Sequence, residues 1–162
     1  MRAGFGGGCH WCTEAVFQAL PGVEKVEQGY IRSIPPDDDW SEAVVVHFSP
    51  ASIDLDTLIE VHLRTHSATS RHVLRHRYRS AVYAFDDDQA RRAQQIMTAL
   101  QRQFSQPLVT RVLPFAGFRA SQPRYQNYYR KHPEAAFCQR YIEPKLARIR
   151  QYDQSHVLKA DK

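Results

Sequence analysis

The stretch GFGGGCHWCTEAVFQALPGV, from Gly4 to Val23, joins a glycine-rich segment to two closely spaced cysteines and then to a helical pattern. Four of the chain's seven glycines lie within its first eight residues. Apolar residues recur at helical spacing over 13–20, and Pro21-Gly22 is a typical helix stop. We therefore expect a helix over 13–20, with the two cysteines at or just before its beginning.

Beyond this stretch the chain alternates between strand-like and helix-like segments. The pattern predicts strands over 23–31, 42–48, 80–85 and 108–113, helices over about 54–66 and 86–104, a loop over 33–40 and irregular structure over 67–77. Such alternation predicts an α/β (α+β) plait, in which a mixed β-sheet carries flanking helices and a coil-rich C-terminal segment follows. The 162 residues contain no repeat and no linker, so we expect a single domain over 1–162.

The composition is that of an ordinary globular protein, with 43% hydrophobic and 24% charged residues. No apolar run approaches the ~20 residues that span a membrane, and no secretory signal pattern opens the chain. Three cysteines cannot form a closed set of disulfides, which favours a reducing compartment. We expect a cytoplasmic protein without membrane contact. The net charge of +5 comes without a nucleic-acid-binding motif and predicts a basic solvated surface.

Cys9 lies where a nucleophile is favoured, at the beginning of a helix. Unpaired N–H groups and the positive end of the helix dipole stabilise a thiolate there. The flanking glycines allow positive φ angles and close approach of a substrate to the backbone. Cys12 is three residues further on, so that the two Cα atoms would be roughly 5–6 Å apart, within disulfide range. Cys9 and Cys12 can therefore form a redox pair.

Two other interpretations of these thiols remain. Cys9 and Cys12 could be half of a zinc site, completed by Cys138 and a histidine, or they could be small buried residues without chemistry. His62 and His66 have a spacing that can hold a metal, but HLRTH lacks the glutamate of a metalloprotease motif. We expect no metal.

Several segments resemble one family in the same order along the chain. The sequence GGGCHWCTEAVFQALPGV followed by GYI is similar to the active-site segment of methionine sulfoxide reductase A, which usually reads Gly-Gly-Cys-Phe-Trp. WSEAVVVHFSP at 40–50, RYRSAVY at 77–83, VLPFAGFRAS at 112–121 and FCQRYIEPKL at 137–146 resemble later segments of that family. The chain is identified as a divergent member of the peptide methionine sulfoxide reductase A family.

The resemblance implies thiol-dependent reduction of methionine-S-sulfoxide, free or in proteins, by a monomer with no metal or organic cofactor. Thioredoxin would be the electron donor, and neither nucleic acid nor membrane would be a partner. It implies Cys9 as the nucleophile, Cys12 and Cys138 as alternative resolving thiols, Trp11 and His10 at the substrate's methyl group, and Tyr30, Glu42 and Tyr78 around the sulfoxide oxygen.

The chemistry of the residues agrees with these roles. A sulfoxide sulfur becomes electrophilic as its oxygen is protonated, so a general acid must lie beside the nucleophile. Glu42 begins an apolar strand, where burial would keep its carboxyl protonated near neutral pH. The hydroxyls of Tyr30 and Tyr78 can donate hydrogen bonds to the oxygen.

The chain departs from the family pattern around the expected pocket. His10 replaces the family's phenylalanine, and its imidazole could lower the pKa of Cys9. Trp40, Val73, Arg77 and Tyr125 also occupy positions where the family has other residues. One alternative is therefore a degenerate member that acts as a peptide-binding or redox-sensing module without efficient turnover. Another, based only on Cys-x-x-Cys and the arginines, is a zinc-binding or nucleic-acid-binding protein.

Overall fold

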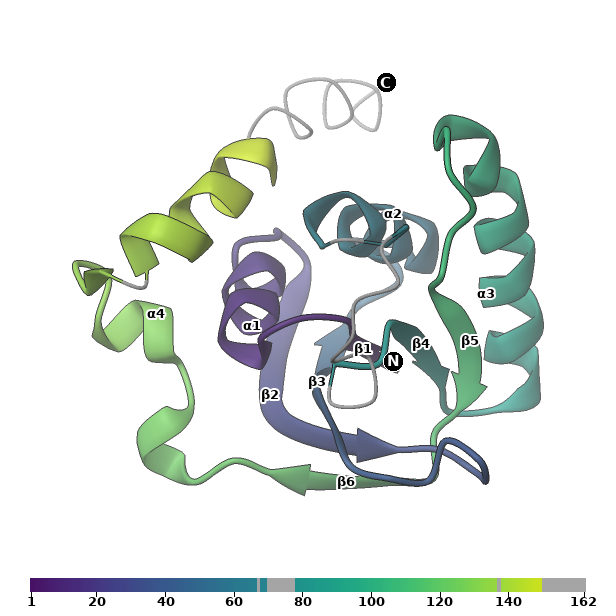
Figure 1. Cartoon of the computed structure of the whole chain (residues 1–162), viewed down its shortest axis with the longest axis horizontal. Helices are drawn as coiled ribbons and strands as arrows, with labels where there is room; N and C mark the ends of the chain where they lie inside the picture. The colour runs from purple at the N-terminus through teal and green to yellow at the C-terminus, as the bar shows by residue number, and fades with distance from the viewer. Residues whose placement is uncertain (67, 70–77, 137, 150–162) are drawn as a thin grey trace.

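A single six-stranded sheet organises the computed structural model, which describes residues 1–66, 68, 69, 78–136 and 138–149 (Figure 1). The strand order is β5-β4-β1-β3-β2-β6. Neighbouring strands are antiparallel except β4 and β5, which are parallel. The strands are β1 (Arg2–Gly6), β2 (Val23–Arg32), β3 (Ser41–Phe48), β4 (Ala81–Ala84), β5 (Arg111–Pro114) and β6 (Gly117–Ala120). The prediction of a mixed sheet in an α+β fold is confirmed.

Helices flank this sheet and follow it towards the C-terminus (Figure 1). Asp54 and Asp86 cap α2 and α3, since their carboxylates accept from Thr57 N and Gln89 N. The helical elements are α1 (His10–Gln18), α2 (Leu55–Thr65), α3 (Asp87–Leu100), the 3₁₀ turns η1 (Gln101–Gln103) and η2 (Pro123–Tyr125), α4 (Tyr128–Lys131) and the π-helical η3 (Cys138–Ile142), which continues as α-helix over 143–149. None of the helices in the described part of the chain is long and apolar enough to cross a membrane.

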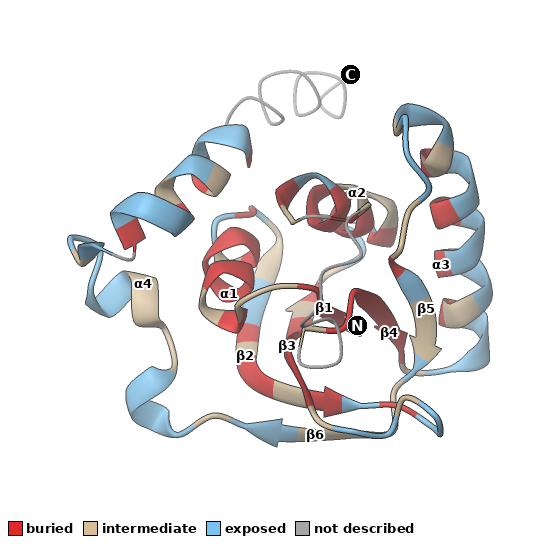
Figure 2. Ribbon diagram, viewed as in Figure 1, coloured by how far each residue is buried: buried red, intermediate tan, exposed pale blue. Residues whose placement is uncertain are grey.

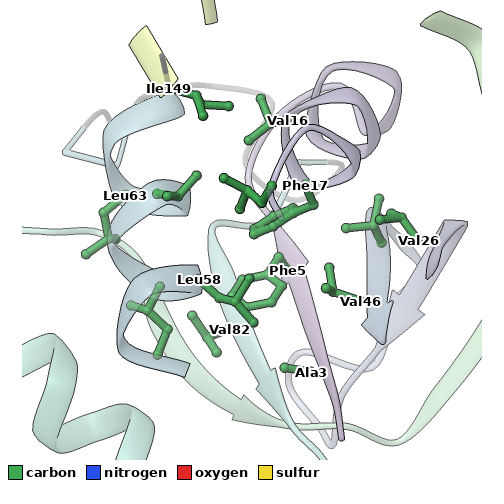
Figure 3. Packing of buried hydrophobic residues seen from close by; sticks show 14 of the residues in the cluster. Ala3, Phe5, Val16, Phe17, Val26, Val46, Leu58, Leu63, Val82 and Ile149 are labelled. Atoms are coloured by element: carbon green, nitrogen blue, oxygen red, sulfur yellow. The ribbon is translucent and has the colours of Figure 1, made fainter. Parts of the chain in front are cut away.

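The main core lies between the sheet and the helices α1 and α2 (Figure 3). Phe5 of β1 and Val46 of β3 face Phe17 of α1 and Leu58 of α2, and each of the four is at most 2% exposed. Side chains alternate along a strand, so Ala43 and Val45 form a smaller cluster on the opposite face. Figure 2 shows that α1 is buried almost all round, while α3 exposes its outer side. The helix that follows Cys9 is thus held on nearly every side.

The central strand β1 is an element that the sequence patterns did not predict. Glycine is disfavoured in strands, so Gly4 and Gly6 kept the segment Arg2–Gly6 from being predicted as a strand. The strand lies between β3 and β4, where a Cβ on Gly4 would lie 2.8 Å from Ile31 Cδ1 and 2.9 Å from Tyr83 Cβ. Gly4 therefore leaves room for side chains of neighbouring strands, and Gly6 for the backbone oxygens of Arg79 and Glu42. The short edge strand β6 was missed as well.

Two predicted boundaries shift in the structure. Helix α1 begins at His10 rather than at 13, because the Cys9 carbonyl already accepts from Cys12 N and Thr13 N at 3.1 Å each. Strand β5 begins at Arg111 rather than at 108. The predicted irregular segment 67–77 lies almost wholly outside the described residues.

Candidate active site

Cys9 is the N-cap residue of α1, directly after a sharp turn out of the central strand. Gly7 adopts a φ of +149°, and a Cβ there would lie 2.6 Å from His66 Cδ2. A Cβ on Gly8 would meet nothing within 4 Å, so the residue before Cys9 borders open space. The half-buried Cys9 is therefore held at a helix N-terminus with a free side for an incoming group.

The pKa of Cys9 lies below its ordinary value, chiefly because the thiol of Cys12 donates a hydrogen bond to its sulfur. The backbone N–H groups of Trp11 and Cys12 act in the same direction, while burial and the Glu42 carboxylate oppose them. The pKa of Cys12 is strongly raised, because its proton is held by the Cys9 sulfur and because it is buried. Of the two thiols, Cys9 is the one that supplies a thiolate.

Cys138, the other candidate resolving thiol, lies at the beginning of η3 and is 0% exposed. Burial, followed by the charge of Glu143, raises its pKa. Negative charge on Cys138 also disfavours the thiolate of Cys12, which is 6% exposed on α1. Cys12 thus interacts with both other thiols.

Glu42 is the second residue of β3, and its side chain lies on the face of the sheet that the helices cover. It is two residues before Val44, a residue of the helix-side core, so alternation places its side chain on the same face. The residue is 5% exposed, and its carboxylate accepts a 3.4 Å hydrogen bond from His10 N. Tyr30 of β2 pairs directly with Glu42 of β3, which brings the phenol beside the carboxyl on one face.

His10 lies beside Glu42 and is 8% exposed. Its Nδ1 is 3.0 Å from the carbonyl oxygen of Gly29. A carbonyl only accepts, so we assign the proton to Nδ1. Nε2 then points towards Glu42, whose Oε1 is 3.4 Å away, and the ring contacts Tyr30 edge-on at 5.4 Å between centroids. His10 and Glu42 can therefore share a proton. The largest contribution to the lowered pKa of Cys9 is the hydrogen bond from Cys12, and the effect of His10 on Cys9 stays a prediction.

Trp11 forms an aromatic wall with residues from the C-terminal third of the chain. Its half-buried indole stacks on Tyr128, with ring centroids 4.1 Å apart and an interplanar angle of 5°. The ring of Tyr125 is 6.2 Å away and tilted by 32°. Such a wall suits a methyl group or another apolar part of a ligand.

Glu14 is a positioning residue that the sequence patterns missed. It is 0% exposed on α1, and its carboxylate accepts from Asn127 N at 2.9 Å, Tyr128 N at 3.1 Å and Gln28 Nε2 at 3.2 Å. Burial raises its pKa, although these three donors oppose the shift. Glu14 thereby fixes the beginning of α4 and the ring of Tyr128. The available signal was a lone carboxylate inside an otherwise apolar helical run.

Tyr78 is half-buried in the bend before β4. The next residue, Arg79, donates its backbone N–H to Ser41 Oγ at 2.8 Å, which places the backbone of Tyr78 near the strand that begins beside Glu42. Val73 and Arg77 lie outside the described residues.

The two histidines with metal-like spacing have other contacts. His62 Nε2 is 2.8 Å from the Gly6 carbonyl oxygen, and His66 Nε2 is 2.8 Å from Ser80 Oγ. Their rings stack with centroids 4.1 Å apart. Within the residues that the structure describes, no three His, Cys, Asp or Glu side chains gather in a group that could hold a metal ion.

Comparisons with known proteins find similar chains over most of the sequence. The family model described as peptide methionine sulfoxide reductase matches residues 1–157. The peptide methionine sulfoxide reductase MsrA of Deinococcus radiodurans is 36% identical over 93% of this chain and 81% of the relative. Methionine sulfoxide reductase A of Corynebacterium diphtheriae superposes with a TM-score of 0.69 at 25% identity, over 83% of this chain and 76% of that chain.

A further structure similar in fold is that of Mxr1 from Saccharomyces cerevisiae in complex with Trx2. It has a TM-score of 0.62 at 21% identity and covers 79% of this chain and 84% of that chain. The prediction that the chain is an oxidoreductase is confirmed by its match to the family. The order of the motifs, the fold and the identity over most of the sequence lead to one conclusion: the chain belongs to the peptide methionine sulfoxide reductase family.

Proposed function

We propose that this chain reduces methionine-S-sulfoxide, free or within proteins, to methionine, with Cys9 as the nucleophile. The observation that carries the proposal is the setting of Cys9: a thiol with a lowered pKa at the N-terminus of α1. The same helix end holds the Glu42 carboxyl through His10 N. Nucleophile and proton donor therefore converge on one place, as the reduction of a sulfoxide requires.

In the reductive step the Cys9 thiolate attacks the sulfoxide sulfur. Glu42 gives its proton to the oxygen as the bond from that oxygen to the substrate sulfur breaks. The oxygen, now a hydroxyl, passes to the Cys9 sulfur and displaces methionine from it, so that methionine leaves with its sulfur reduced by two electrons and Cys9 remains as a sulfenic acid. His10, with its Nδ1–H held by Gly29 O, presents an unprotonated Nε2 to Glu42, where it can accept a hydrogen bond from the protonated carboxyl.

The remaining site residues would position the substrate. The hydroxyl of Tyr30 lies on the same face as Glu42 and would donate to the sulfoxide oxygen, as would Tyr78. Trp11, with Tyr128 stacked behind it, would hold the S-methyl group, and His10 would border the same pocket. Fixed partners on both sides of the sulfur allow one epimer to be preferred.

The oxidised enzyme would be recycled through a disulfide. Cys12 or Cys138 would condense with the Cys9 sulfenic acid and release water, and a thioredoxin-type dithiol would then reduce the disulfide. The similarity in fold to Mxr1, which was crystallised with Trx2, supports this choice of partner. The cycle requires no metal and no organic cofactor, and we propose that the chain works as a monomer.

Single-turnover reduction of each methionine sulfoxide epimer tests the proposal. Without a recycling reductant, the wild type, Cys12→Ser and Cys138→Ser should each release about one methionine per chain from the S epimer, because the first step needs only Cys9. Cys9→Ser should release none. Release of methionine by Cys9→Ser would contradict the assignment. Binding of the S epimer by the wild type without release would indicate a peptide-binding module instead.

A further inference from the structure

A small cavity lies on the side of the two thiols that faces α2 and the C-terminal helical segment. Its volume is about 50 Å³, and its lining includes Cys9, Cys12, Thr65 of α2 and Lys145 from the segment 143–149. This is enough space for a water molecule. The reductive step proposed above gives no role to the ammonium group of Lys145 on this side of the thiols.

Lys145 is a half-buried cation tied to this cavity. Its Nζ donates a hydrogen bond to the carbonyl oxygen of Thr65, the last residue of α2. The negative end of a helix dipole favours an ammonium group there. Burial lowers the pKa of Lys145, and the thiolate charges of Cys12 and, to a smaller extent, Cys9 oppose this shift. The ammonium is therefore close enough to both thiols to interact with them.

The positive charge of Lys145 acts mainly on the thiolate of Cys12. The factors that lower the pKa of Cys9 are its hydrogen bonds from Cys12 and from the backbone of α1. For Cys12, the charge of Lys145 lowers the pKa, while negative charge on Cys9 or Cys138 raises it. Lys145 thus favours a Cys12 thiolate, which the reduced site otherwise suppresses.

We propose that Lys145 is a positioning residue for Cys12 as the resolving thiol: its ammonium stabilises the Cys12 thiolate that attacks the oxidised Cys9 sulfur. The S–S bond forms as the S–O bond of the Cys9 sulfenic acid breaks. The proton of Cys12 and the departing hydroxyl leave as one water molecule, for which the cavity has room. The inference rests on the proposed function only for the source of the sulfenic acid.

The test isolates the resolving step. In a Cys138→Ser background, one equivalent of hydrogen peroxide generates the Cys9 sulfenic acid without any methionine sulfoxide. A dimedone-type trap measures its decay, and mass spectrometry of the peptides measures the Cys9–Cys12 disulfide. Lys145→Met, Lys145→Arg and Lys131→Met are compared. Lys131 is the matched control, since it is exposed and also donates to a backbone carbonyl, that of Pro123.

We expect Lys145→Met to slow disulfide formation about tenfold, as a shift of one pKa unit in the attacking thiol would. Lys145→Arg should restore a rate close to that of the background, and Lys131→Met should not change it. In a separate assay with methionine sulfoxide, the first release of methionine should be the same in Lys145→Met. Failure of that release in the wild type would contradict the proposed function and leave the peroxide experiment informative.

Three results would overturn the inference. The first is an unchanged rate of disulfide formation in Lys145→Met. The second is an equal slowing in Lys145→Arg, which would indicate shape rather than charge. The third is the absence of a Cys9–Cys12 disulfide in the Cys138→Ser background. If circular dichroism shows that Lys145→Met is unfolded, Lys145→Gln replaces it, and unfolding of both variants would assign Lys145 a structural role and also reject the inference.

Discussion

The two flanks of Cys9 are built by different kinds of contact. On the sheet side, Glu42 and Tyr30 are opposite residues of the paired strands β3 and β2, and backbone ladders fix their positions. On the C-terminal side, Tyr125 and Tyr128 lie on single-turn elements, held by side chains such as Glu14 and Gln28 that bind backbone groups. Glu42, the proposed proton donor, is thus placed by the pairing of strands, and the aromatic wall by a few side chains. Substitutions should change chemistry on the first flank and substrate fit on the second.

The largest effect should come from Glu42→Gln, which tests the sheet side. Glutamine keeps the shape of the side chain but has no acidic proton, so single-turnover reduction should slow by ~10²–10⁴-fold. Substrate binding, measured as the concentration that gives half the maximal single-turnover rate, should change much less. Glu60→Gln, on α2, is a control that should leave the rate unchanged. An unaltered rate in Glu42→Gln would transfer the acid role to a tyrosine.

The second effect, from Glu14→Gln, tests the C-terminal side. The amide retains one accepting oxygen and places a donor against backbone N–H groups, so the free energy of unfolding should fall by about 1–3 kcal/mol. The loss of order at Tyr128 should raise KM more than it lowers kcat. Urea unfolding and steady-state kinetics check both, with the exposed Glu24→Gln as control. A loss confined to kcat would contradict the division between the two flanks.

The sign of the pH dependence of Glu14→Gln follows from the raised pKa of Glu14. The folded chain binds this proton more tightly than the unfolded chain, whose value is about 4.5. The contribution of Glu14 is therefore most favourable below that pH and decreases as the pH rises through the folded value. The stability deficit of the variant should be larger near pH 4.5 than at pH 7.

A smaller effect, on the pKa of Cys9, should show whether the hydrogen bond from Cys12 or burial controls that thiol. Cys12→Ala removes the main hydrogen bond to the Cys9 sulfur, so the midpoint of Cys9 alkylation should rise by about one pH unit towards the ordinary value. Cys12→Ser keeps a donor and should retain a midpoint below that of the alanine variant. Rates of iodoacetamide alkylation between pH 5 and 10, in a Cys138→Ser background, provide the measurement. Identical midpoints in the two variants would show that burial rather than hydrogen bonding controls Cys9.

The smallest effect should come from His10→Phe, on the sheet side. A phenyl ring cannot reach both Gly29 O and Glu42, so the pH profile of kcat/KM should change, by less than about tenfold at its maximum. The midpoint of Cys9 alkylation should stay where it is, because its main donors are Cys12 and the α1 backbone. A shifted alkylation midpoint with an unchanged kinetic profile would assign His10 to the thiol rather than to the acid.

Sequence patterns predicted most of the sheet and helices, because Val44, Val46 and the apolar face of α2 follow the periods of a buried strand and an amphipathic helix. They missed β1, where packing against Ile31 and Tyr83 selects glycine against its strand propensity. The position of Cys9, the proposed nucleophile, at the beginning of a helix was predictable from the sequence. The contact of His10 with Glu42 and that of Glu14 with α4 join residues 32 and 113 or more positions apart, which no local pattern reports.

The hydrogen bond from Cys12 to Cys9 also determines which thiol meets an oxidant first. While Cys9 is a thiolate, Cys12 keeps its proton and has little nucleophilic character, so we expect peroxides and electrophiles to react at Cys9 before Cys12. Once Cys9 is oxidised, its sulfur no longer carries the charge that held the Cys12 proton. The hydrogen bond therefore acts as an interlock: the neighbouring thiol becomes available only after the first reaction has taken place.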